Sequence, residues 1–80
     1  MNNKFNWPID MNVREKWTGE ILIIYRGIDR GNIKLSLSLI KIEFILKKRP
    51  KEITQKMFNE CITLFDEKYI IETIDNEINN

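Results

Sequence analysis

The sequence has no histidine, no alanine and only one cysteine, Cys61. Histidine is the commonest general base and transition-metal ligand in proteins, so its absence removes the usual chemistry of many enzymes and metal sites. A single cysteine excludes an internal disulfide and a cysteine-based metal site within one chain. We therefore expect a protein that is not an enzyme and that uses no metal or other cofactor.

Long apolar runs are also missing. The longest run, residues 21–25, is too short to cross a bilayer, and residues 1–17 contain no apolar segment of signal-peptide length. The cysteine content does not require an oxidising compartment. We expect a cytoplasmic protein, of a bacterial or a host cell, that makes no contact with membranes.

The apolar residues that are present are mostly bulky. A chain of 80 residues is expected to form a single domain that buries about 60% of its unfolded surface. Isoleucine is the most frequent apolar residue available for the core, and its β-branched side chain favours a sheet over a helix bundle. The heavy use of Lys, Asn and Ile indicates A/T-rich codons, a bias that is typical of many phages, plasmids and low-GC bacteria.

Residues 33–46 carry the most regular pattern in the chain. Apolar and polar residues alternate over the first half of this stretch, which is the period of a strand with one solvated face. After the adjacent apolar pair Leu39 and Ile40, the apolar set shifts by one position, so a single core requires a bulge or bend near Lys41. We interpret the stretch as one long strand, with a helix over residues 39–48 as the alternative.

The segments before this stretch also predict strands. Residues 1–13 alternate from Phe5 onward but include Pro8, so they predict either a strand or an arm laid over the core. If the segment is a strand, it should lie at a sheet edge or start after the proline. Residues 21–25 are apolar without alternation, which predicts a central strand covered on both faces. The two glycines within residues 26–32 predict a hairpin loop between strands.

A helix and a last strand are predicted after Pro50, which suits a first helical turn. Apolar residues recur every three or four positions over residues 52–68, which predicts an amphipathic helix. Residues 69–74 predict an edge strand, and residues 75–80 a frayed polar tail. The predicted fold is α+β: a mostly antiparallel sheet of three or four strands with one amphipathic helix packed on one face, in the order β-β-β-α-β.

Charge is distributed unevenly although the formal net charge is only +1. Basic residues outnumber acidic ones over residues 26–56, and the reverse holds over residues 57–80. Four basic residues stand where we expect the helix to begin, and cations there oppose the helix dipole. They are Lys47, Lys48, Arg49 and Lys51. This cluster predicts a site for phosphates or another anion, unless the side chains are merely solvated.

A second candidate surface is the predicted loop after residue 25. Arginine beside aromatic residues is typical of interface hot spots, and Tyr25, Trp7 and Trp17 are expected near this loop. The candidate partner-binding residues are Arg26, Ile28, Asp29 and Arg30, with Ile28 exposed at the loop tip. An edge strand formed by residues 69–74 or by the N-terminal segment also offers strand addition, including homodimer formation.

These observations favour binding over catalysis. Cys61 falls on the apolar side of the predicted helix, where a small buried hydrophobe is expected rather than a reactive thiol. Our hypothesis is a small protein-binding domain, of the inhibitor or immunity type encoded by phages and mobile elements, that occludes a macromolecular partner. The alternative is a nucleic-acid-binding module that uses the basic cluster together with Lys34 and Lys41.

Overall fold

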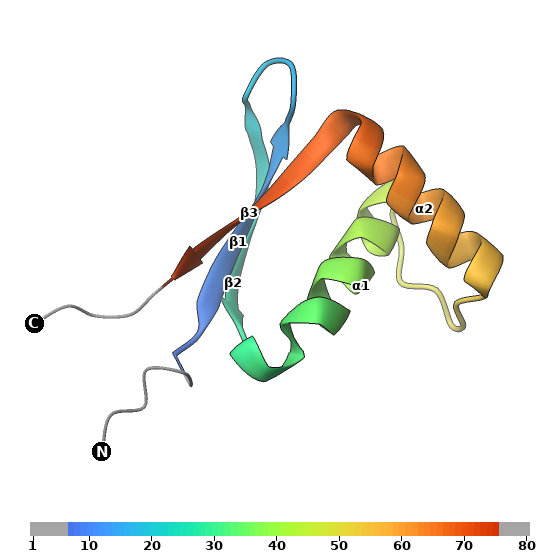
Figure 1. The fold of residues 1–80 in the computed structure, drawn as a ribbon, viewed down its shortest axis with the longest axis horizontal. Coiled ribbons are helices and arrows are strands. Elements are labelled where there is room, and N and C mark those ends of the chain that lie inside the picture. The colour runs from blue at the N-terminus through green and yellow to red at the C-terminus, as the bar shows by residue number, and fades with distance from the viewer. Residues whose placement is uncertain (1–6, 76–80) are drawn as a thin grey trace, which may run out of the picture.

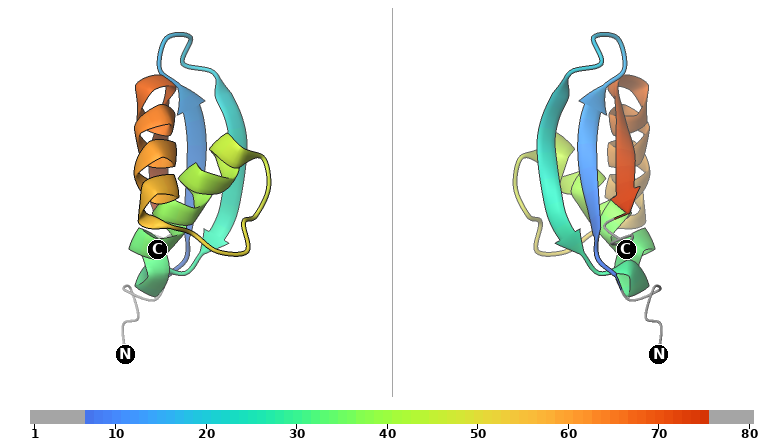
Figure 2. Two further views of the ribbon diagram at one scale, coloured as in Figure 1. Left: turned by 90° about the vertical axis from the view of Figure 1, so that its right-hand side faces the viewer. Right: turned by 90° about the vertical axis from the view of Figure 1, so that its left-hand side faces the viewer.

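The computed structural model describes residues 7–75, which form a three-stranded antiparallel sheet and two α-helices. The elements follow one another as β1 (Ile9–Glu15), β2 (Ile21–Ile28), the 3-10 helix η2 (Arg30–Asn32), α1 (Ile33–Leu46), α2 (Gln55–Lys68) and β3 (Tyr69–Asp75). The strands are ordered β2-β1-β3, and both helices lie on the same side of the sheet (Figures 1 and 2). The α+β class is confirmed, but the order β-β-β-α-β with one helix is wrong.

The stretch that the alternation predicted to be a strand is helix α1. Ile33, Leu37, Ile40 and Phe44 fall on one side of this helix and pack toward the core, at the spacing of a helical stripe. The shift near Leu39 therefore needs no bulge, because a helix has no strand parity to break. A strand of 14 residues would also exceed the usual strand length of about 3–10 residues.

The positions of the first two strands are the reverse of those predicted. β1 starts directly after Pro8, and it is the central strand, paired with β2 on one side and β3 on the other. β2 is an edge strand, although its unbroken apolar run predicted a central one. The predicted contribution of Phe5 lies outside the described residues.

The hairpin lies earlier in the chain than predicted. Residues 16–20 connect β1 to β2, and Gly19 has the positive φ of 75° that this turn requires. The predicted loop at residues 26–32 instead contains the end of β2 and η2. The Asp29 side chain caps η2 by accepting a hydrogen bond from the Gly31 backbone N–H, so the chain passes directly into α1.

The predicted amphipathic helix and the last edge strand are both present, but the helix begins later than the predicted start beside Pro50. α2 begins at Gln55, where the Thr54 hydroxyl oxygen accepts the Met57 backbone N–H, and it buries Cys61 and Phe65. Its predicted solvent face is exposed at Gln55, Lys56, Asn59, Glu60 and Thr63. β3 is an edge strand paired with β1. The expected tail after residue 75 lies outside the described residues.

The core lies between β1 and the two helices. Ile9, Met11 and Val13 of β1 pack with Ile40 of α1 and Phe65 of α2. Around Phe65, the rings of Phe44 and Tyr69 lie with centroids 5.6 and 5.3 Å away. One aromatic cluster therefore joins both helices to the start of β3.

Candidate functional site

One face of the sheet is not covered by any of the described elements. Met11 and Val13 point to the helices, so the alternation of β1 directs Asp10, Asn12 and Arg14 to the opposite face. The right-hand view of Figure 2 looks onto this face, with both helices behind the sheet. We call it the open face.

Isoleucines flank the polar centre of the open face on both edge strands. Arg14 pairs with Ile21 on β2 and with Ile70 on β3. Asn12 pairs with Ile24, and Asp10 pairs with Ile74. Cross-strand partners point to the same side of a sheet, so Ile21, Ile24, Ile70 and Ile74 belong to the open face. Each of the four side chains remains 42–48% exposed.

The charged groups of the open face are paired with one another. Arg14 donates from Nε and Nη2 to Glu72 Oε1, at 3.0 and 2.9 Å. Arg26 lies 3.6 Å from Asp10 Oδ2, while Asp10 Oδ1 accepts the Gly27 backbone N–H at 3.0 Å. The face therefore combines an approximately neutral polar centre with apolar flanks. Arginines and large apolar residues with little net charge are typical of protein interfaces.

The centre of the open face holds a buried polar group without a partner. Asn12 is 6% exposed, and its Oδ1 accepts no hydrogen bond within the described structure. An unsatisfied buried acceptor costs about 1–3 kcal/mol. The central position of the sheet is therefore less stable than an apolar residue would make it.

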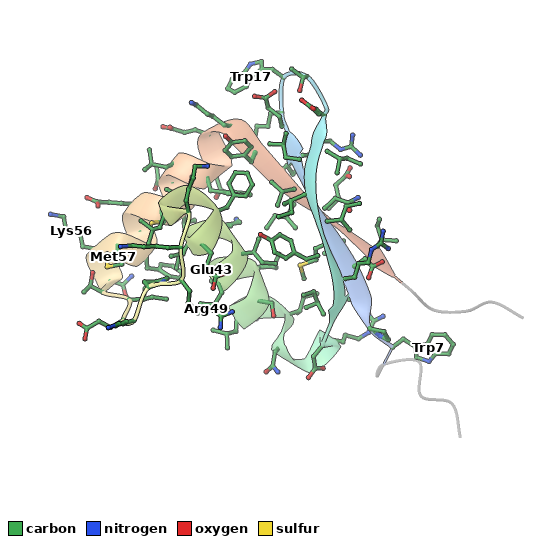
Figure 3. The ribbon with its side chains drawn as sticks, turned by 180° about the vertical axis from the view of Figure 1, so that it is seen from behind. Trp7, Trp17, Glu43, Arg49, Lys56 and Met57 are labelled. Atoms are coloured by element: carbon green, nitrogen blue, oxygen red, sulfur yellow. The ribbon has the colours of Figure 1, made fainter. Side chains whose placement is uncertain are left out.

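Further exposed apolar surface lies along β2 and at the hairpin. Ile21 to Ile24 of β2 are all exposed, and Trp17 at the hairpin is 74% exposed. Figure 3 shows Trp17 at the tip of the hairpin and Trp7 at the opposite end of the sheet. Continuous exposed apolar surface of this kind is a mark of interaction sites.

A small cavity lies between β2 and α1, on the helix side of the sheet. It has a volume of about 200 Å³ and is lined by Tyr25, Ile28, Ser36, Leu39, Ile40, Glu43 and Arg49. Arg49 Nε donates to Glu43 Oε2 at 3.0 Å across its rim (Figure 3). Burial raises the pKa of the Tyr25 phenol, and the Glu43 carboxylate raises it further. The cavity offers no nucleophile paired with a base.

Of the four residues predicted to bind a partner, only Arg26 reaches the open face. Ile28 is not at an exposed loop tip, because it is half-buried and packs against the core. Asp29 is used in capping η2. Arg30 donates from Nε to the Trp7 carbonyl oxygen at 3.1 Å, which ties the start of the described chain to η2.

The predicted placement of the basic cluster at a helix N-terminus is wrong. Lys47 is the C-cap of α1, and α2 starts only at Gln55 after the connecting segment of residues 47–54. Lys47, Lys48, Arg49 and Lys51 are all exposed. Cations at a helix C-terminus are favoured by the helix dipole, so the argument for an anion site at this point no longer holds.

The other basic residues of the nucleic-acid hypothesis do not extend this cluster. Lys41 Nζ lies 2.8 Å from Asp66 Oδ1. Lys34 is in the first turn of α1, about 20 Å from the far end of that helix at 1.5 Å per residue. The fold therefore separates the basic residues along α1.

Comparison with known proteins gives no relative for this chain: no protein-family model, no curated protein and no solved structure matches it. No helix among residues 7–75 is long and apolar enough to cross a membrane. The same residues hold no cluster of three side chains suited to binding a metal ion.

The open face was missed because its residues were assigned to the wrong strand positions. The apolar run at the start of β2 predicted burial on both faces, whereas Ile21 and Ile24 are exposed on an edge. The alternation of residues 9–13 predicts a strand, but an edge strand or an arm has no neighbouring strand on one of its sides. Because β1 is central, its polar residues lie between the isoleucines of β2 and those of β3.

Proposed function

We propose that this chain is a small non-enzymatic domain that binds a protein partner through the open face of its sheet. The observation that carries the proposal is the arrangement of Ile21, Ile24, Ile70 and Ile74 around a self-paired polar centre. A partner that presents hydrogen-bonding groups to the centre and apolar groups to the two flanks matches this face. Trp17, beside it on the hairpin, supplies the large aromatic side chain that hot spots favour.

The mode of action that we propose is occlusion. An uncovered sheet face that lies against a partner would cover part of that partner's surface, which is how compact inhibitors act. An immunity-type protein is the particular form of this proposal. Occlusion requires that the partner lose an activity or a contact when the open face is bound.

The test is affinity capture followed by a binding measurement with the purified partner. We expect I70K and I74K, each placing a charge on the open face, to weaken binding by about 10-fold or more, since each loses an apolar contact worth about 1.5–3 kcal/mol. The matched control is L64K, because Leu64 is 51% exposed on α2, away from the sheet. Loss of binding in L64K with retention in I70K and I74K would reject the open face as the site.

The exposed segment of residues 47–51 keeps nucleic-acid binding as a second candidate. Its test is titration of DNA and RNA at several salt concentrations with the triple variant K47E/K48E/R49E. If this candidate is right, the wild-type chain binds DNA or RNA with an affinity that falls as the salt concentration rises, and the triple variant does not bind. Binding of a protein partner that survives nuclease treatment and is unaffected by the triple variant would remove it.

A further inference from the structure

β2 presents an apolar outer edge that no described strand covers. The sheet order β2-β1-β3 leaves this edge without a neighbour among residues 7–75. Edge strands usually carry lysine or proline that discourages pairing with another chain. From Ile21 to Tyr25 there is neither, and four consecutive aliphatic side chains are 39–45% exposed.

The part of β2 suited to pairing is bounded by two irregularities. The register with β1 shifts between Ile21 and Ile23 and again between Tyr25 and Ile28. Gly27, with a φ of 71°, lies in the second shift. Between the shifts, Ile23, Ile24 and Tyr25 pair in regular order with β1, so the regular segment has Ile24 at its centre.

We propose that β2 pairs antiparallel with β2 of a second copy of this chain, with the two Ile24 residues facing each other at the two-fold axis. The result is a continuous six-stranded sheet in the order β3-β1-β2-β2-β1-β3. Symmetric antiparallel pairing keeps both helical layers on one side and both open faces on the other. It also places Ile23 opposite Tyr25 of the second copy, an aliphatic–aromatic cross-strand pair of a favourable kind.

Charge complementarity selects a second copy as the occupant. At the hairpin end of β2, Glu20 is exposed and its carbonyl oxygen accepts the Glu15 backbone N–H at 2.9 Å. At the other end, the side chains of Arg26 and Arg49 are 74% and 84% exposed, although each also contacts a carboxylate of its own chain, Asp10 and Glu43 respectively. Antiparallel pairing brings the acidic end of each copy to the basic end of the other.

The proposed register gives this complementarity a specific contact. Glu20 lies opposite Ile28 of the second copy when the two Ile24 residues face each other. Arg49 lines the same cavity as Ile28, on the helix side of the sheet. Glu20 points to that side as well, because it lies across from Glu15, which shares the parity of Met11 and Val13. In the proposed dimer, Glu20 of each copy therefore approaches Arg49 of the other copy, whose guanidinium also bonds to Glu43.

The first experiment is sedimentation of the full chain from micromolar to near-millimolar concentration. We expect a monomer–dimer equilibrium that I24K abolishes, because two lysines would face each other at the axis. The control I70K changes the same residue type at nearly equal exposure, 48% against 45%, on the other edge strand, and should leave the dimer intact. A wild-type chain that stays monomeric throughout, or a dimer lost in I70K and kept in I24K, would overturn the proposal.

Two further variants test the register and the charge pairing. I24C should form a covalent dimer under mild oxidation, whereas I70C should not. The native Cys61 should not cross-link, because it is buried and only 4% exposed. E20R and R49E should each weaken the dimer by about 10-fold. Because R49E also places a carboxylate beside Glu43, the double variant E20R/R49E should recover affinity relative to R49E alone. Failure of the double variant to recover affinity, or cross-linking in I70C alone, would contradict the register.

This proposal is independent of the protein-binding function. Dimerisation uses the edge of β2 and leaves Ile70 and Ile74 on the open face unused. If the β2 edge instead receives a strand from a different protein, the wild-type chain remains monomeric, and I24K loses that partner while I70K and I74K keep it, which rejects the second copy. Loss of partner binding in I74K with an intact dimer separates the two proposals.

Discussion

At the scale of single residues, Asn12 is the position where this fold is least optimised for stability. It is buried in the central strand with Oδ1 unpartnered. The replacement N12V removes that acceptor and adds a β-branched side chain that suits a strand. We expect N12V to raise the free energy of unfolding by about 1 kcal/mol, measured by urea denaturation.

The opposite change at the same position provides the control. N12D would bury a charge beside Glu72, its cross-strand neighbour, and should lower the free energy of unfolding by more than N12V raises it. A lower stability for N12V than for the wild type would show that the Asn12 amide makes a favourable contact.

Tyr25 predicts a pH dependence of stability. Burial, and secondarily the Glu43 carboxylate, raise the pKa of its phenol in the folded state. The folded chain then retains a proton that the unfolded chain releases near pH 10, so this contribution is complete below that pH and is lost as the pH rises through the folded-state pKa. Y25F should remove this loss in urea denaturation at alkaline pH, and E43Q should reduce it by a smaller amount.

A spectroscopic measurement assigns the effect to this residue. In a Y69F background, tyrosinate absorbance reports Tyr25 alone, since the chain has two tyrosines. We expect its titration to be displaced above pH 10 while the protein remains folded. Equal slopes of stability against pH in the wild type and Y25F would show that the alkaline loss of stability does not come from the Tyr25 phenol.

At the scale of the elements, the end of α1 is determined by Lys47. This residue has a φ of 62° in the left-handed region, and its backbone N–H bonds to the Glu43 carbonyl oxygen. Glycine is preferred at such a C-terminal position because it has no Cβ to crowd the backbone. The structure therefore assigns to Lys47 a role that its place in a basic run did not reveal.

We expect K47G to raise the free energy of unfolding by about 0.5 kcal/mol. Relief of the left-handed conformation is worth about 1 kcal/mol, and loss of the Lys47 ammonium over the Phe44 ring, 5.6 Å from its centroid, subtracts about 0.5 kcal/mol. The control is K48G, which adds chain flexibility without relieving strain and should be destabilising. Equal effects of the two variants in thermal unfolding would contradict this explanation.

At the scale of the whole molecule, Phe65 connects the layers. It is fully buried in the core with β1 and α1, and its ring lies beside Phe44 and Tyr69. F65A should lower the free energy of unfolding by about 3–5 kcal/mol, a large share of the stability of a small domain. The adjacent L64A, at a residue that is 51% exposed, should cost less than about 1 kcal/mol in the same urea titration. Similar losses of stability in F65A and L64A would show that Phe65 is not a central residue of the core.

Features that depend on local pattern follow from the amino-acid sequence alone. The stripe of residues 52–68 specified α2, because apolar residues at three- and four-residue spacing bury one side of a helix and no side of a strand. The segments at residues 21–25 and 69–74 specified two strands, because β-branched side chains suit an extended backbone. The predicted burial of Cys61 is also confirmed, since its neighbours at helical spacing are apolar.

Which strand lies at the centre of the sheet, and which faces the helices cover, depends on packing between distant segments. Residues 33–46 satisfy a strand alternation and a helical stripe at once, and packing against Phe65 and β1 selects the helix. An apolar run such as Ile21 to Ile24 is the same in a buried central strand and in an edge that binds another chain. What distinguishes the two is whether a neighbour lies beside it, and that depends on contacts between residues far apart in the sequence.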